Sequence, residues 1–223
     1  MKPFIALLLF MGWALHAHAQ GIVYFSYGAG IWVGEPQSLA PIAQYSMDLN
    51  GDGVNDFRFV GGTPFSGGFY LEPQNQNGVL GYPSDAFRSA FRVRRLLAGA
   101  DISAGATATG LEWVGYRPQP LSSVTGPYLL SSFGPGDSGG EFAPVRLGQP
   151  REGYLAVQFY AADGLHYGWI RVLGSYYNDG TILDYAYNAV PGQGLAAGVV
   201  PEPGTLALFG VGALCLWRFR RAA

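Results

Sequence analysis

The stretch DLNGDGVNDF at residues 48–57 has the residue types and the spacing of a loop that binds a cation through oxygen atoms. Oxygen-bearing side chains stand at positions 1, 3, 5 and 9 of such a calcium loop: Asp48, Asn50, Asp52 and Asp56. Gly53 stands at the turn position, and the main-chain carbonyl of Val54 can supply the oxygen of position 7. Position 12 is Phe59 instead of a bidentate glutamate, so a further ligand has to come from another loop. The sequence predicts calcium as a cofactor here, and the alternative is an Asp/Asn/Gly turn whose carboxylates face water.

A second stretch, GPGDSGGEF at 134–142, places around Ser138 the letters GDSGG that surround the nucleophile of chymotrypsin-like proteases. A serine nucleophile needs an imidazole base. In those proteases the histidine precedes the serine, whereas His166, the only histidine after residue 19, follows it. A glycine-rich turn explains the same letters, so we expect no protease activity and no other catalysis.

Two functions that involve sugars remain open. Sugar faces pack on aromatic rings, and Tyr176 and Tyr177, beside a predicted turn at 178–180, are the best candidates for exposed stacking residues. A polysaccharide hydrolase instead needs two carboxylates about 5–10 Å apart. The candidates for such a pair are Glu112, Glu141, Glu152, Asp163 and Asp184. Because the sequence pairs none of them, a carbohydrate-binding, lectin-like module is the stronger of these hypotheses and a secreted polysaccharide hydrolase the weaker.

Short runs of alternating apolar and polar residues must form the scaffold that positions these side chains. Each run predicts a β-strand, and the runs are 21–28, 56–62, 110–116, 154–163, 166–174 and 181–188. Residues 84–97 differ, because Phe87, Phe91 and Leu96 recur near the helical period and predict one short helix. No long repeat is visible, so the pattern predicts an all-β fold, an antiparallel two-sheet β-sandwich of jelly-roll type.

The N-terminus has the pattern of a signal peptide. Lys2 precedes an apolar run over residues 4–15, and the sequence AHA at 17–19 supplies the small-x-small pattern that signal peptidase reads. We therefore predict a signal peptide over residues 1–19, its removal by signal peptidase, and export of the remaining chain.

The C-terminus predicts a marginal membrane anchor. The 14 residues 204–217 are uncharged, and a helix of that length spans about 21 Å, less than the ~30 Å hydrocarbon core of a bilayer. Arg218, Arg220 and Arg221 follow and fix the tail on the cytoplasmic side by the positive-inside rule. The transmembrane helix at about 204–217 therefore leaves the folded domain, predicted over 20–198, outside the membrane.

Composition limits the kind of partner. The only cysteine, Cys215, lies in the C-terminal apolar run, so the exported domain forms no disulfide. The chain has 13 basic and 15 acidic residues, and four of the basic ones are Lys2 of the signal peptide and the three arginines of the tail. The exported part therefore keeps nine basic residues against 15 acidic ones, Glu202 included, which gives it a net charge of −6. This balance argues against nucleic acid as a partner.

The segment before the anchor is rigid and extended, because it contains Pro201, Glu202 and Pro203. Together with the short apolar run and the arginine cluster, it resembles the PEP-CTERM sorting signal of Gram-negative bacteria, over residues 199–223. The resemblance implies recognition of Pro-Glu-Pro by an exosortase, a membrane peptidase, and transfer from a transient inner-membrane anchor to the cell surface or extracellular matrix. Residues 166–172 and 184–198 also resemble the end of a β-rich ectodomain common in this group, to which no activity is attached. We expect a non-enzymatic surface or matrix protein, with extracellular polysaccharide as the alternative partner.

Overall fold

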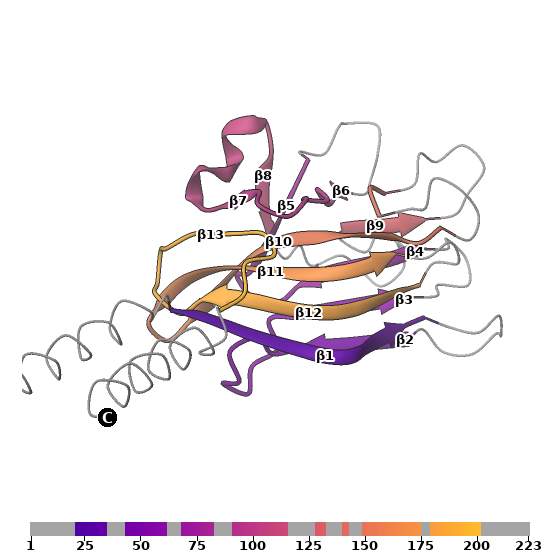
Figure 1. The fold of residues 1–223 in the computed structure, drawn as a ribbon, viewed down its shortest axis with the longest axis horizontal. Coiled ribbons are helices and arrows are strands. Elements are labelled where there is room, and N and C mark those ends of the chain that lie inside the picture. Colours follow the sequence, from indigo (N-terminus) through magenta and orange to yellow (C-terminus); the bar gives the residue numbers. More distant parts are fainter. Residues whose placement is uncertain are drawn as a thin grey trace, which may run out of the picture.

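The computed structural model describes residues 21–34, 43–61, 68–82, 91–115, 128–132, 140–142, 149–174 and 179–201, which form an all-β protein (Figure 1). Its strands are β1 (Ile22–Val33), β2 (Ala43–Met47), β3 (Phe57–Gly61), β4 (Gly68–Pro73), β5 (Gly78–Gly81), β6 (Phe91–Arg92), β7 (Asp101–Ile102), β8 (Glu112–Gly115), β9 (Tyr128–Ser132), β10 (Arg151–Ala161), β11 (Gly164–Gly174), β12 (Gly180–Asn188) and β13 (Leu195–Ala196). One 3-10 helix, η1 (Ala104–Thr109), precedes β8. The predicted two-sheet β-sandwich is confirmed.

The larger sheet has the order β1-β12-β11-β10-β5-β8, and all of its pairs are antiparallel. Its centre is the meander of β10, β11 and β12, in which β10 pairs with β11 from Arg151 opposite Gly174 to Ala161 opposite Gly164. The three runs of alternating residues between 154 and 188 predict these three strands. The strands β10, β11 and β12 run side by side through the middle of the described part of the molecule (Figure 1).

The smaller sheet has the order β2-β3-β4-β9-β6. Its first three strands form a second meander, with Met47 opposite Phe57 and Phe57 opposite Pro73. The β6–β9 pair is parallel, with Phe91 opposite Tyr128. The sheet is therefore antiparallel except at this end.

Apolar side chains fill the space between the two sheets. Each sheet contributes residues that are fully buried, such as Phe59 and Phe69 from the smaller sheet, whose rings stack at 5.8 Å, and Val157 and Ile170 from the larger one. The alternation of β11 sends Ile170 toward this core and Trp169 to the other face. Both faces of the larger sheet are thus buried near its middle.

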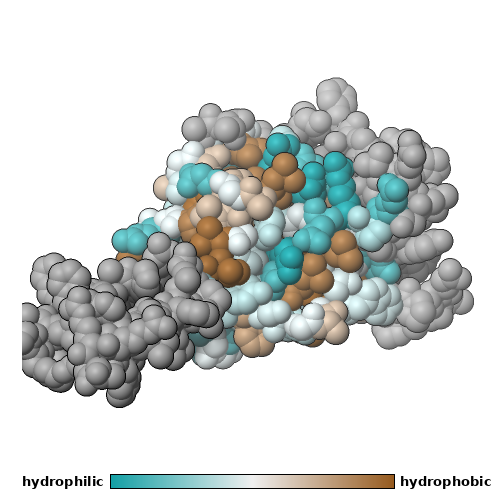
Figure 2. Space-filling model, viewed as in Figure 1, coloured by the Kyte–Doolittle hydropathy of each residue, from teal (hydrophilic) through white to brown (hydrophobic). Residues whose placement is uncertain are grey.

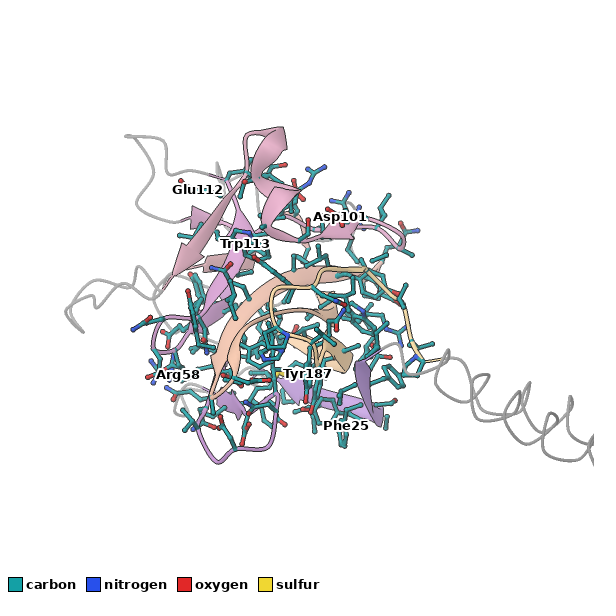
Figure 3. All side chains as sticks on the ribbon, turned by 90° about the vertical axis from the view of Figure 1, so that its left-hand side faces the viewer. Phe25, Arg58, Asp101, Glu112, Trp113 and Tyr187 are labelled. Atoms are coloured by element: carbon teal, nitrogen blue, oxygen red, sulfur yellow. The ribbon has the colours of Figure 1, made fainter. Side chains whose placement is uncertain are left out.

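A second, smaller core lies on the outer face of the larger sheet. Trp169 and Tyr167 of β11 pack there under β7, η1 and β13, together with Ile102 and Leu195. The two-stranded β13–β7 ribbon pairs Leu195 with Ile102. In Figure 3 this layer lies at the top, marked by Asp101, Glu112 and Trp113, while Phe25 and Arg58 lie on the opposite side.

The helix predicted over 84–97 is wrong where the structure describes it, at residues 91–97. Phe91 lies in β6, and Leu96 pairs with Tyr154 through two backbone hydrogen bonds of 2.9 and 3.0 Å. The Arg94 N–H donates to the Leu80 carbonyl at 3.1 Å. These long-range backbone bonds override a local period that fits a helix equally well.

The signal peptide predicted over 1–19 and the helix predicted over 204–217 lie outside the described residues. Within the described ranges, we find no helix with the length and apolar character needed to cross a membrane.

Candidate functional site

The loop predicted to bind calcium joins β2 to β3 and is held by its own hydrogen bonds. Asp48 accepts from the Gly51 N–H at 2.7 Å and from the Gly53 N–H at 2.8 Å, one bond to each carboxylate oxygen. Asp52 accepts from the Val54 N–H at 2.8 Å. Gly51 and Gly53 have φ values of 76° and 86°, the left-handed region in which glycine carries no steric penalty. The Asp and Gly positions of the sequence motif therefore build the turn itself.

Asn50 adds two further hydrogen bonds within the loop, both to Asp52. Its Oδ1 accepts from the Asp52 N–H at 3.2 Å, and its Nδ2 donates to Asp52 Oδ2 at 3.0 Å. Across the described ranges, no group of three or more His, Cys, Asp or Glu side chains lies close enough together to hold a metal ion. Each oxygen of Asp48 and Asp52 already accepts a hydrogen bond, so this conformation of the loop needs no ion to satisfy it.

Asp56, the last of the predicted ligands, is buried beneath the loop. Its Oδ2 accepts from the Leu49 N–H at 2.8 Å, and its Oδ1 accepts from Asn77 Nδ2 at 2.9 Å. Asn77 in turn accepts from the Tyr160 N–H at 2.9 Å through its Oδ1. Asp56 and Asn77 therefore connect the loop to β10 of the other sheet.

Burial raises the pKa of Asp56 to about 6. The hydrogen bonds from Leu49 and Asn77 lower this pKa, while the negative charges of Asp48 and Asp52 raise it. The loop thus keeps one carboxyl group that titrates close to neutral pH.

An aromatic cluster occupies the same end of the sandwich. Phe25 stacks on Tyr185 with ring centroids 5.5 Å apart and meets Tyr27 edge-on at 5.0 Å. The Tyr45 hydroxyl donates to the Tyr27 hydroxyl at 3.0 Å. Burial raises the pKa of Tyr187, and the charges of nearby acidic residues, Asp163, Asp48 and Asp56, raise it further. The charges of Asp48 and Asp56 also raise the pKa of Tyr185, so they act on the rings of this cluster.

The exposed rings in the described ranges lie mainly on β1. Tyr24, Phe25 and Trp32 are 38, 48 and 50% exposed. Trp32 Nε1 donates to Asp179 Oδ2 at 3.2 Å, which holds the indole in place. The predicted stacking residues Tyr176 and Tyr177 lie outside the described ranges, and Asn178 separates them from Asp179 in the chain. In the face that Figure 2 shows, apolar residues form separate patches among hydrophilic ones.

The carboxylates considered for sugar hydrolysis mostly form ion pairs. Asp184 pairs with Arg171 and is itself buried, while Glu152 contacts the same guanidinium at 3.2 Å. Glu141 pairs with Arg94 at 2.8 Å. The contacts of Arg171 connect β10, β11 and β12, and the contact of Glu141 ties residues 140–142 to the segment after β6.

His166 is held by contacts within the domain. Its ring is buried, with Nδ1 2.8 Å from the Asn188 carbonyl and Nε2 2.8 Å from Asp163 Oδ1. It stacks on Phe159 at 5.4 Å. Ser138 of the protease-like stretch lies outside the described ranges.

A cleft of about 420 Å³ opens between β5 and the η1 segment. Leu80 and Leu96 form part of its wall, and Tyr82, Arg94 and Asp101 bring polar groups to it. The guanidinium of Arg94 also lies 5.7 Å from the centre of the Tyr82 ring.

The chain leaves the folded domain at a defined point. Ala197 donates to the Ala100 carbonyl at 2.8 Å, and Trp169 Nε1 donates to the Val199 carbonyl at 3.3 Å. Pro201 is exposed, two residues beyond Val199. The remaining predicted sorting residues, Glu202, Pro203, Arg218, Arg220 and Arg221, lie outside the described residues.

Comparison with known proteins identifies this terminal segment. The family model of the PEP-CTERM protein-sorting motif matches residues 199–221. Neither a curated protein nor a solved structure shows significant similarity to the chain. The motif implies export, sorting by an exosortase and processing at the membrane in Gram-negative bacteria. The chain thus carries a PEP-CTERM protein-sorting motif, which begins where the described β-sandwich ends.

Proposed function

We propose that this chain is a non-enzymatic protein displayed at the cell surface or in the extracellular matrix, held briefly in the inner membrane and then processed by an exosortase at Pro201–Pro203. The observation that carries the proposal is the position of Pro201. It is exposed, and only Val200 separates it from Val199, which is hydrogen-bonded to the domain. A membrane peptidase can thus reach the motif while the sandwich stays folded.

Intact mass of the protein from the native envelope and the culture medium tests this proposal. We expect loss of residues 1–19 and a new C-terminus near 201–203. Replacing Pro201 and Pro203 by alanine should leave the C-terminus intact, while Pro191→Ala, in another exposed loop, should be processed normally. A wild-type species that ends at Ala223 in every fraction contradicts the proposal.

A carbohydrate-binding role is the second candidate, and the Trp32 ring favours it. A half-exposed indole held by a hydrogen bond to Asp179 offers a flat face of fixed orientation, which suits stacking on sugars. The predicted stacking residues Tyr176 and Tyr177 lie three and two residues before Asp179 in the sequence. Trp32→Ala should abolish retention on the polysaccharide of the native matrix, whereas Tyr160→Ala, which removes a ring that is 49% exposed, should not. Equal retention of wild type and Trp32→Ala contradicts this role.

Calcium is proposed as an accessory to either role. The donor set of the 48–56 loop consists of hard oxygen atoms, which suits this ion. Binding requires Asp48 and Asp52 to exchange some internal hydrogen bonds for the cation.

A further inference from the structure

The first strand, β1, forms one edge of the larger sheet. It pairs with β12 on one side, and no described residue pairs with its other side. The regular part of this pairing runs from Ile22 opposite Asn188 to Ser26 opposite Asp184, before the register shifts. A strand edge of this kind presents unpaired N–H and C=O groups to its surroundings.

The direction of these groups follows from the ladder. The Gly21 carbonyl accepts from the Ala189 N–H, so this pair is of the hydrogen-bonded type. Because hydrogen-bonded and non-hydrogen-bonded pairs alternate in an antiparallel ladder, Val23 and Phe25 bond to β12. The backbone groups of Ile22, Tyr24 and Ser26 therefore point outward along the free edge.

The side chains on this edge are apolar and exposed on both faces of the sheet. Val23 is 40% exposed and lies on the same face as Phe25, while Tyr24 lies on the opposite face against Trp169. The strand contains neither a charged residue nor a proline between Ile22 and Val33. Natural edge strands usually carry such residues to prevent association.

We infer that β1 pairs with β1 of a second copy of this chain, antiparallel and centred on Tyr24. In this register Tyr24 lies opposite Tyr24 of the second copy and Ile22 opposite its Ser26, so all outward backbone groups find partners. Val23 then faces Phe25 of the second copy as a non-hydrogen-bonded pair, an aromatic and β-branched combination that sheets favour.

A second copy fits this edge better than another partner, because the edge is complementary to itself. A two-fold axis through Tyr24 satisfies each donor with an equivalent acceptor, as an isologous interface requires. The neutral strand also avoids the like-charge repulsion that a net charge of −6 creates elsewhere on the exported part. The result is a continuous sheet across two molecules.

Sedimentation velocity of the processed protein tests the pairing, over about 1 µM to 1 mM, the range that covers weak interfaces. We expect a reversible dimer. Val23→Lys should abolish it, because the two lysines bring like charges to the edge, and Leu97→Lys is the matched control. Leu97 is 64% exposed and follows Leu96, which pairs with β10, and β12 and β11 separate β10 from β1, so its replacement should leave the dimer intact.

Disulfide formation tests the register. In a Cys215→Ser background, Tyr24→Cys places two sulfurs opposite one another across the axis and should yield a cross-linked dimer on mild oxidation. Ser26→Cys faces Ile22 of the second copy and should not cross-link. A monomer at every concentration, a dimer that survives Val23→Lys, or cross-linking by Ser26→Cys in place of Tyr24→Cys overturns the inference. Circular dichroism of each variant establishes that it is folded.

Discussion

Trp169 Nε1 donates a hydrogen bond to the main-chain oxygen of Val199 at 3.3 Å, so the first residue of the sorting motif is tied to the middle of β11. The same indole meets the Tyr154 ring edge-on at 5.2 Å. The fold therefore fixes where the sorting motif starts.

Replacing Trp169 by phenylalanine should destabilise the protein by about 2 kcal/mol, because a hydrogen bond worth about 1 kcal/mol is lost and a cavity remains. Urea unfolding measures the loss. Limited proteolysis with mass analysis should also show new cuts before Val199. Trp113→Phe is the control, because its buried Nε1 has no hydrogen-bond partner in the described part of the chain and no such bond is lost. Equal losses in both variants would mean that the Val199 bond contributes nothing.

Gly198→Ala should be more damaging than Gly192→Ala. Both glycines have positive φ, 78° and 73°, so alanine carries a backbone strain of about 1 kcal/mol at either position. A Cβ on Gly198 would also lie 2.8 Å from the Tyr154 hydroxyl, whereas a Cβ on Gly192 meets nothing within 4 Å. Thermal unfolding of the two variants isolates the clash. Equal midpoints would show that Tyr154 moves aside without cost.

The free energy of unfolding should fall as pH rises from about 4 to 6 in calcium-free buffer. The pKa of Asp56 is about 6 in the folded protein, against about 3.9 in an unfolded chain. The folded state therefore binds more protons in this window, and its stability is lost as Asp56 ionises, by about 3 kcal/mol at most. Urea titrations at several pH values measure this slope.

The Asp56→Asn variant should flatten that pH profile, because the titrating group is gone. Glu112→Gln, which replaces an exposed carboxylate, should keep the wild-type slope. A slope that persists in Asp56→Asn assigns it to another group.

Millimolar calcium should raise the unfolding midpoint if the 48–56 loop binds the ion. An ion bound only to the folded state stabilises it by about 2.7 kcal/mol at a hundredfold excess over Kd. Asp48→Asn should abolish the shift, because it removes a charge and keeps an acceptor for the Gly51 or Gly53 N–H. Magnesium is the control ion, since it demands a tighter octahedral site. An unchanged midpoint at millimolar calcium rules out the site.

Alternation in the sequence was sufficient to predict the central strands. The run 166–174 predicts β11, and the turn predicted at 178–180 predicts its hairpin with β12. Side-chain period is a local property, which a single sequence displays. By contrast, the pairing of Phe91 with Tyr128 and of Leu96 with Tyr154 depends on distant backbone, and the local period there suggested a helix.

In the candidate site, too, the sequence predicted the local structure but not the long-range contacts. The spacing of Asp48, Asp52 and Gly53 predicted a tight polar loop, and the loop is present. The motif did not predict that Asp56 turns inward. Asp56 bonds to Asn77, which precedes β5 and accepts a hydrogen bond from β10, and both strands lie outside the motif. The exposed rings of Tyr24 and Phe25 were missed because alternation suggests a strand but does not show that the strand lies at an edge.

The pairing of β1 with β12 joins the first strand of the domain to one of its last. Tyr24 and its hydrogen-bond partner Asp184 are 160 residues apart in the chain. Synthesis starts at the N-terminus, so β1 is the first strand of the domain to be made. Its pairing partner β12 is made only after almost all of the rest of the domain. The uncharged apolar edge of β1 is therefore exposed longest in the nascent chain, and the larger sheet closes only when β12 arrives.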